Sequence, residues 1–162
     1  MPGPVDTSTA RWRRWPLDRI VTEDGATIDF FGEPMILNSR NRSHVCDEDV
    51  IRLLTPAVER LTVRNCVNVT DASILAAADC PLVALNVHDC RKLTDASIKA
   101  VGKSLEILDV WNCSRLTDVS IIAVAGPTLL SLTLAWCRNL TVTSLHAIAL
   151  NCPRLEVLDV AC

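Results

Sequence analysis

The sequence predicts an α/β solenoid in which a ladder of parallel strands lines the concave face and helices cover the convex face. Residues 82–90 read Leu-x-x-Leu-x-Val-x-x-Cys, and this alternation of apolar residues is typical of a short strand. Residues 93–101 read Leu-Thr-Asp-x-x-Ile-x-x-Val, which is helical spacing behind a threonine that can cap a helix. One strand and one helix cannot bury an apolar face alone, so the unit requires a copy of itself on each side.

These copies are present, and they recur every 23–26 residues. Successive strand patterns begin at Val58, Leu82, Leu105, Leu129 and Leu155. The first four end in a cysteine, and these ladder cysteines are Cys66, Cys90, Cys113 and Cys137. A period of this length is that of leucine-rich repeats. The predicted fold is therefore a leucine-rich-repeat solenoid, in which cysteine occupies the position that asparagine holds in other subtypes.

Three segments that begin at a ladder cysteine also resemble a known family. Residues 66–74, 90–98 and 113–121 read Cys-x-x-(Val/Leu)-Thr-Asp-x-Ser-Ile, which is similar to the cysteine-containing leucine-rich repeats of F-box proteins and their relatives. The resemblance covers residues 45–162. It implies substrate recognition in a cullin-type (SCF-type) ubiquitin ligase. That role requires an F-box, and residues 1–45 lack the Leu-Pro start of one and contain turn and strand signals instead.

The chain before the repeats divides into a tail at residues 1–24 and a divergent capping repeat at residues 25–57. Within the tail, residues 11–15 read Arg-Trp-Arg-Arg-Trp. Three interpretations stay open for this segment: the end of a mitochondrial presequence, a basic-aromatic contact strip, or tryptophans that cover an open end of the solenoid. The capping repeat is expected to contain a strand at residues 27–31. Its helix is expected at Asp47, because residues 45–50 align with residues 69–74.

Residues 58–162 form the repeats proper, and each helix of this part has the same predicted start. The capping threonines are Thr70, Thr94, Thr117 and Thr141. Aspartate follows in the first three cases, where its charge meets the positive end of the helix dipole, whereas Val142 follows in the last. The apolar stripe that each helix turns inward begins at Ile74, Ile98, Ile121 and Leu145. The last repeat is incomplete at Cys162, and we expect a fragment of a longer protein or an end that another chain covers.

The cysteines predict buried thiols in an intracellular protein. Six of the eight fall at positions that recur in the repeats, namely the ladder cysteines together with Cys80 and Cys152, which precede prolines. Such an arrangement favours packed, reduced thiols over a disulfide framework, with the cytoplasm or nucleus as the expected compartment and the mitochondrion as another. Cysteines one repeat apart lie in a line, so no tetrahedral metal site is expected.

Composition narrows the class of function further. The formal net charge is −3, which gives no bias toward nucleic acid or anionic membranes. No apolar run reaches the ~20 residues of a membrane-spanning helix. With only five glycines, the chain also shows no phosphate-binding glycine-rich loop. We expect no cofactor, no small-molecule substrate, no nucleic acid and no membrane span.

The candidate contact surface lies on the concave face and at the ends of the strands. Neighbouring strands are ~4.8 Å apart, so Arg64, His88 and Trp111 are expected side by side. Asn86 and Asp109 occupy the adjacent row, and Trp136 follows its strand. Aromatic and basic residues of this kind dominate protein interfaces. The competing interpretation is a solvated strand face on which the tryptophans shield neighbouring turns.

No catalytic residue is predicted. His88 and Cys90 are close in sequence, but Cys90 belongs to the buried ladder whereas His88 points to the concave face, so a nucleophile–base pair is not expected. The predicted function is a non-catalytic scaffold for protein–protein interaction. The alternative is a structural subunit or assembly factor of a large mitochondrial or axonemal complex.

Overall fold

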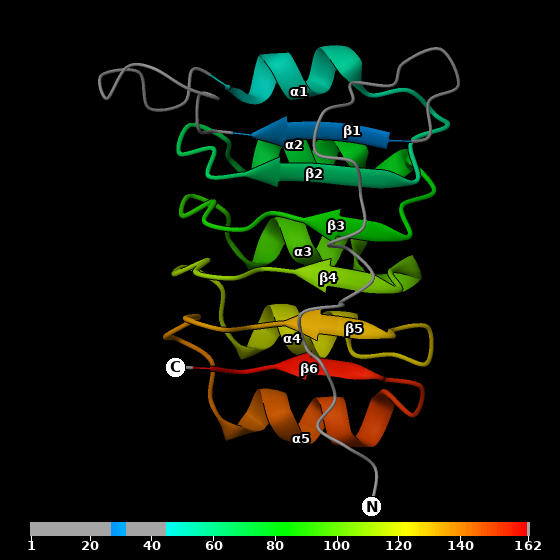
Figure 1. The fold of residues 1–162 in the computed structure, drawn as a ribbon, viewed down its shortest axis with the longest axis vertical. Coiled ribbons are helices and arrows are strands. Elements are labelled where there is room, and N and C mark those ends of the chain that lie inside the picture. The colour runs from blue at the N-terminus through cyan, green and yellow to red at the C-terminus, as the bar shows by residue number, and fades with distance from the viewer. Residues whose placement is uncertain (1–26, 32–44, 162) are drawn as a thin grey trace, which may run out of the picture.

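The computed structural model describes residues 27–31 and 45–161, and their strands form one parallel sheet in chain order (Figure 1). The strands are β1 Thr27–Phe31, β2 Arg60–Arg64, β3 Ala84–Asn86, β4 Ile107–Asp109, β5 Ser131–Thr133 and β6 Val157–Asp159. The helices are α1 Asp47–Leu53, α2 Asp71–Ala76, α3 Asp95–Val101, α4 Asp118–Val124 and α5 Val142–Asn151. Short 3₁₀ helices, η3 Ala77–Asp79 and η4 Gly102–Ser104, extend α2 and α3. The strands lie one above another, and α2, α3 and α4 lie behind them.

The strand register is the one that the repeat predicts. Leu61 pairs with Leu85, Leu85 with Leu108, and Leu108 with Leu132. These ladder leucines are at most 1% exposed. A shift by one residue would turn every apolar side chain to the opposite face, so the periodic leucines fix the register. The α/β class, the parallel order and the helical layer are thus confirmed.

The ladder cysteines occupy the core at the turn after each strand. Cys66, Cys90 and Cys113 are fully buried, and Cys137 is nearly so. The Cys90 thiol donates to the Val63 carbonyl at 3.0 Å, and the Cys137 thiol donates to the Val110 carbonyl at 3.0 Å. The Cys113 thiol likewise donates to the Val87 carbonyl, so three of the four sulfurs bind the backbone of the preceding unit, whereas the Cys66 thiol donates to the Arg64 carbonyl of its own unit.

The predicted threonine caps are confirmed, and a second set of hydrogen bonds joins them to the preceding unit. The Thr94 hydroxyl accepts from the Ala96 amide at 3.3 Å at the start of α3. Thr94 also donates through its amide (2.8 Å) and its hydroxyl (2.6 Å) to the carboxylate of Asp71 in the unit before. The same pair of bonds recurs in the other units, at Thr70–Asp47, Thr117–Asp95 and Thr141–Asp118. The sequence indicated only the aspartate–dipole interaction, whereas the structure shows a ladder that links every unit to the next.

The divergent first unit begins with the predicted elements. Residues 27–31 form β1, which pairs in parallel with β2, and α1 begins at Asp47 with Cys46 as its N-cap residue. Asp47 accepts from Thr70 as the regular units do, which ties this unit to the repeats. Hydrogen bonds to Thr70 and Ser73 outweigh partial burial, so the pKa of Asp47 is lowered. The tail at residues 1–24, with its Arg-Trp segment, lies outside the described residues.

The last described unit exposes apolar side chains whose counterparts are buried. Leu145 is 40% exposed, whereas its counterparts Ile74, Ile98 and Ile121 are fully buried. The expectation that Leu145 begins an inward stripe is therefore wrong, because no further helix of the described chain packs on α5. Val142 and Val160 are also exposed and line a groove of about 550 Å³. Among the described residues no helix is long and apolar enough to cross a membrane.

Candidate functional site

The strands end at one edge of the sheet, which we call the exit edge, and each turn there uses a left-handed residue. These residues are Asn65 (φ 55°), Asp89 (φ 59°), Asn112 (φ 54°) and Trp136 (φ 63°). Their amides continue the ladder, since Asp89 N donates to the Trp111 carbonyl at 2.8 Å and Trp136 N donates to the Ala161 carbonyl at 2.9 Å. The side chains of successive turns therefore lie in columns along the exit edge.

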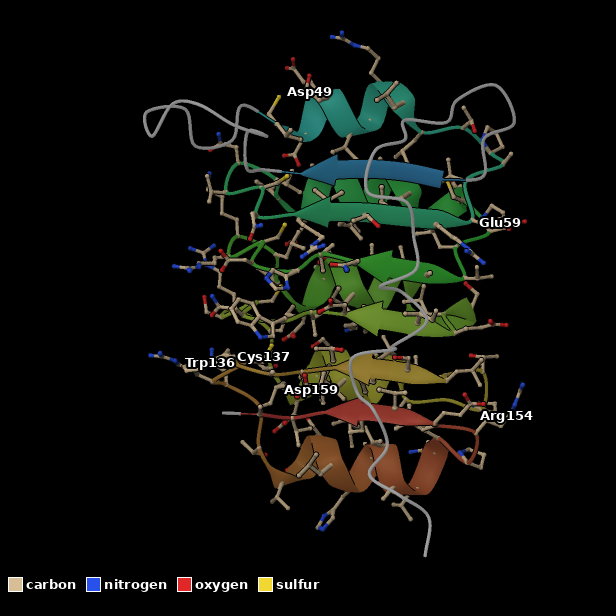
Figure 2. The ribbon with its side chains drawn as sticks, viewed as in Figure 1. Asp49, Glu59, Trp136, Cys137, Arg154 and Asp159 are labelled. Atoms are coloured by element: carbon tan, nitrogen blue, oxygen red, sulfur yellow. The ribbon has the colours of Figure 1, made fainter. Side chains whose placement is uncertain are left out.

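Three aromatic rings lie together at the exit edge. His88 and Trp111 are stacked, with ring centroids 4.2 Å apart and an angle of 9° between the planes. Trp136 lies 6.5 Å from Trp111, tilted by 57°, and Figure 2 shows it at the end toward which the strand arrows point. Trp136 is 45% exposed, whereas His88 and Trp111 are half-buried. The structure thus places His88 beside Trp111, as the sequence predicts.

The environment of His88 keeps its ring neutral at ordinary pH. Burial is the main cause and the positive charge of Arg64 adds to it, against the opposing charge of Asp89, so the pKa of His88 is lowered to about 4. A neutral imidazole stacks on Trp111 without a charge to solvate. Arg64 is half-buried and lies close enough to influence His88 electrostatically, so the structure brings these two predicted residues together.

Asn86 and Asp109, which precede His88 and Trp111 by two positions, are buried, with 4% and 2% of their surface exposed. The Asn86 side-chain oxygen accepts from the His88 amide at 3.1 Å, and an Asp109 carboxylate oxygen accepts from the Trp111 amide at 3.0 Å. Each side chain therefore holds the backbone of the aromatic residue two positions later. The sequence analysis placed Asn86 and Asp109 among the residues that contact a partner. In the structure their side chains instead bind the backbone amides of His88 and Trp111 and so position these two residues.

Ionisation of the buried Asp109 carboxyl group is unfavourable. Its burial raises the pKa to about 6, although the bond from the Trp111 amide and the charge of Arg64 act in the opposite direction. In β6, the Asp159 carboxylate makes the equivalent bond, since it accepts from the Ala161 amide at 3.1 Å, but Asp159 is exposed.

Three further polar residues, Asp89, Arg91 and Asn112, belong to the site, and the sequence analysis gave them no interaction. Asp89 accepts from Arg91 Nε at 2.8 Å and from the Asn112 side-chain amide at 2.6 Å. These bonds join two adjacent turns beside Trp111. A shallow pocket of about 420 Å³ opens here, lined by Arg91, Trp111, Asn112, Ser114, Trp136 and Arg138. Alignment of the turns by their cysteines would have placed Arg91, Ser114 and Arg138 in one column.

The His88 imidazole and the Cys90 thiol do not form a nucleophile–base pair. The Cys90 thiol donates to the Val63 carbonyl, and its burial raises the pKa to about 12, so it is protonated at neutral pH. The part of the chain that the structure describes contains no group of His, Cys, Asp and Glu side chains placed to hold a metal ion. What the exit edge offers is an aromatic and basic surface.

Comparison with known proteins finds similarity at the level of structure. No protein-family model and no curated protein matches the chain. A chain in the crystal structure of the Rad7 and Elc1 complex in yeast matches with a TM-score of 0.61 and 27% sequence identity. The match covers 72% of this chain and 33% of that one, so this chain spans about a third of the length of the protein it resembles. The matched chain is part of a protein–protein complex.

Proposed function

We propose that this chain is a leucine-rich-repeat solenoid that recognises a partner protein through its exit edge. The observation that carries the proposal is the aromatic group His88–Trp111–Trp136, which is partly exposed beside Arg91 and Arg138. Tryptophan and arginine are the residues most enriched where interfaces concentrate binding free energy. In this proposal residues 25–57 are the capping repeat, residues 58–162 are the interaction repeats, and no reaction is catalysed.

The specific version that we propose is substrate recognition in a cullin-type ubiquitin ligase of the intracellular space. Its support is the Cys-x-x-(Val/Leu)-Thr-Asp-x-Ser-Ile motif and the similarity to a chain of the Rad7 and Elc1 complex. The alternative is a structural subunit or assembly factor of a large complex. The stacked units favour it equally, because such a scaffold serves either role.

Affinity capture of the tagged full chain from cells tests both versions. A cullin and its adaptor among the captured proteins support the ligase version, and stoichiometric capture of one large assembly supports the alternative. The variant His88→Ala/Trp111→Ala removes the aromatic stack without touching the leucine ladder, so we expect partner capture to fall at least tenfold. The control His146→Ala/Val119→Ala changes two exposed residues on helices and is expected to capture the partner normally. Equal capture by both variants would show that the exit edge is not the contact surface.

A further inference from the structure

The pocket at the exit edge combines an aromatic wall with two arginines. The rings of Trp111 and Trp136 meet at 57° and form two sides of a bent apolar wall. A large apolar side chain can contact both rings at once. If that side chain is aromatic, it can also pack edge-to-face against one of the two rings, a favoured geometry for aromatic pairs.

A small residue between the two arginines keeps the pocket open. Arg91, Ser114 and Arg138 each follow a ladder cysteine directly, so they occupy the same position in three successive turns. Successive turns are ~4.8 Å apart, which puts the Arg91 and Arg138 backbones about 10 Å from each other. Ser114 lies between them and fills little of that space, so both guanidinium groups border one hollow.

The electrostatic character of this pocket is positive although the chain as a whole carries −3. Arg91 uses Nε for Asp89 and is 60% exposed, which leaves its terminal nitrogens toward solvent. Arg138 is exposed and makes no ion pair within the described residues. Asp89 is the only carboxylate of these three turns beside the pocket, and it is already bonded to Arg91 and Asn112.

The backbone of Trp136 gives independent evidence of a binding role. At the same left-handed position the other turns use Asn65, Asp89 and Asn112, which tolerate positive φ because their short polar side chains bond locally. A bulky ring at φ 63° is unfavourable by about 1–3 kcal/mol, and residues strained in this way cluster at ligand sites. Because the ring is 45% exposed, core burial does not account for it.

From these observations we propose that the pocket binds an acidic segment of the partner protein that carries a large apolar side chain. The apolar side chain lies against Trp111 and Trp136, and flanking carboxylates bind Arg91 and Arg138. This inference deepens the proposed function and rests on it. The charge of the occupant follows from complementarity to the two arginines.

Fluorescence anisotropy with the full chain and defined peptides tests the proposal. The probe is a fluorescein-labelled peptide, Glu-Asp-Glu-Phe-Glu-Asp-Glu, in a buffer at physiological ionic strength. We expect it to bind at least tenfold more tightly than a control peptide with glycine in place of phenylalanine. A second control peptide, with lysine in place of every glutamate and aspartate, is expected to bind most weakly of the three. Stronger binding of a single-stranded uridine oligomer would instead assign the pocket to nucleic acid and overturn the proposal.

Three variants and one matched control locate the binding. Arg138→Gln is expected to weaken it about tenfold, whereas the matched variant Arg115→Gln, which lies outside the pocket lining, should change it less than twofold. Ser114→Leu keeps the charge and fills the hollow, so it should weaken binding as well. Trp136→Asn removes one ring while installing the residue that neighbouring turns use, so the fold is retained and binding falls. If Arg138→Gln and Arg115→Gln act equally, the attraction is diffuse and the pocket is not the site.

This inference and the proposed function fail in different ways. If the acidic peptide does not bind but His88→Ala/Trp111→Ala still abolishes partner capture, only the chemistry assigned to the occupant is wrong. If neither the peptide nor the partner depends on Trp111, the exit edge itself is not an interaction surface.

Discussion

Replacing Asp109 with asparagine is expected to stabilise the protein at neutral pH. Asp109 is 2% exposed, and its carboxylate accepts from the Trp111 amide. Asn86 makes the same contact with His88 one unit earlier, so the neighbouring turn shows that an asparagine side chain fits this geometry. The substitution therefore keeps the hydrogen bond and removes a buried charge.

The magnitude follows from the pKa of Asp109, which is about 6 in the folded protein against an ordinary value of 3.8. Between these pH values the folded state binds more protons than the unfolded state, so the free energy of unfolding falls as the pH rises. At about 1.4 kcal/mol per pH unit, the ionised carboxylate lowers the stability by up to about 3 kcal/mol above pH 6. We expect Asp109→Asn to gain about 2–3 kcal/mol at pH 7.5 and to lose this gain below pH 4.

Urea unfolding followed by circular dichroism from pH 4 to pH 8 measures the difference between the two proteins. The protonation of His88, whose lowered pKa makes both proteins less stable as the pH falls from 6.5 toward 4, cancels in this difference. Asp159→Asn is the control, because the Asp159 carboxylate makes the equivalent bond from an exposed position and its replacement should change stability by less than about 0.5 kcal/mol. A variant Asp109→Asn that gains nothing at pH 7.5, or whose gain persists at pH 4, would refute the assignment of a buried, costly charge.

Three further substitutions test the packing, the unit-to-unit ladder and the strained turn. A Cβ at Gly102 would lie 2.3 Å from the Val124 side chain, so Gly102→Ala should cost about 1–3 kcal/mol in thermal unfolding, whereas Gly126→Ala, with its nearest contact at 3.7 Å, should be nearly neutral. Asp95→Ala removes the carboxylate that accepts two hydrogen bonds from the next unit, and a loss of about 2 kcal/mol is expected in urea unfolding. Trp136→Asn should raise the melting temperature, since it relieves a positive φ at a half-exposed ring, and a fall of several degrees would contradict the strain.

The repeat itself could be predicted because its signals are local in sequence. Threonine before aspartate marks the start of a helix wherever the flanking residues can become helical, and α2, α3 and α4 each begin at that aspartate. The alignment of residues 45–50 with residues 69–74 also predicted the helix of the divergent unit correctly, since α1 begins at Asp47 with Cys46 in the capping position. The prediction for Leu145 was wrong because the same local pattern has a different outcome where no further helix of the described chain covers it.

For the candidate site the sequence predicted that His88 and Trp111 are neighbours, but not what the polar residues around them contact. Spacing in the repeat is enough to place His88 beside Trp111, because residues at the same position of parallel strands are neighbours. It does not tell whether Asn86 and Asp109, in the next row, are open to a partner or covered. Their burial and their bonds to the amides of His88 and Trp111 are properties of the packed structure and do not follow from the spacing.

By itself the sequence determined the parallel order, the register and the positions of the helix caps, because a strict apolar period allows only one alignment that buries every leucine. Only the tertiary structure decided which polar side chains are desolvated and which rings touch. It also decided that each helix-start aspartate binds the threonine of the following unit. Those properties depend on distances between residues that are more than twenty positions apart in the chain, and such distances exist only after the units have packed.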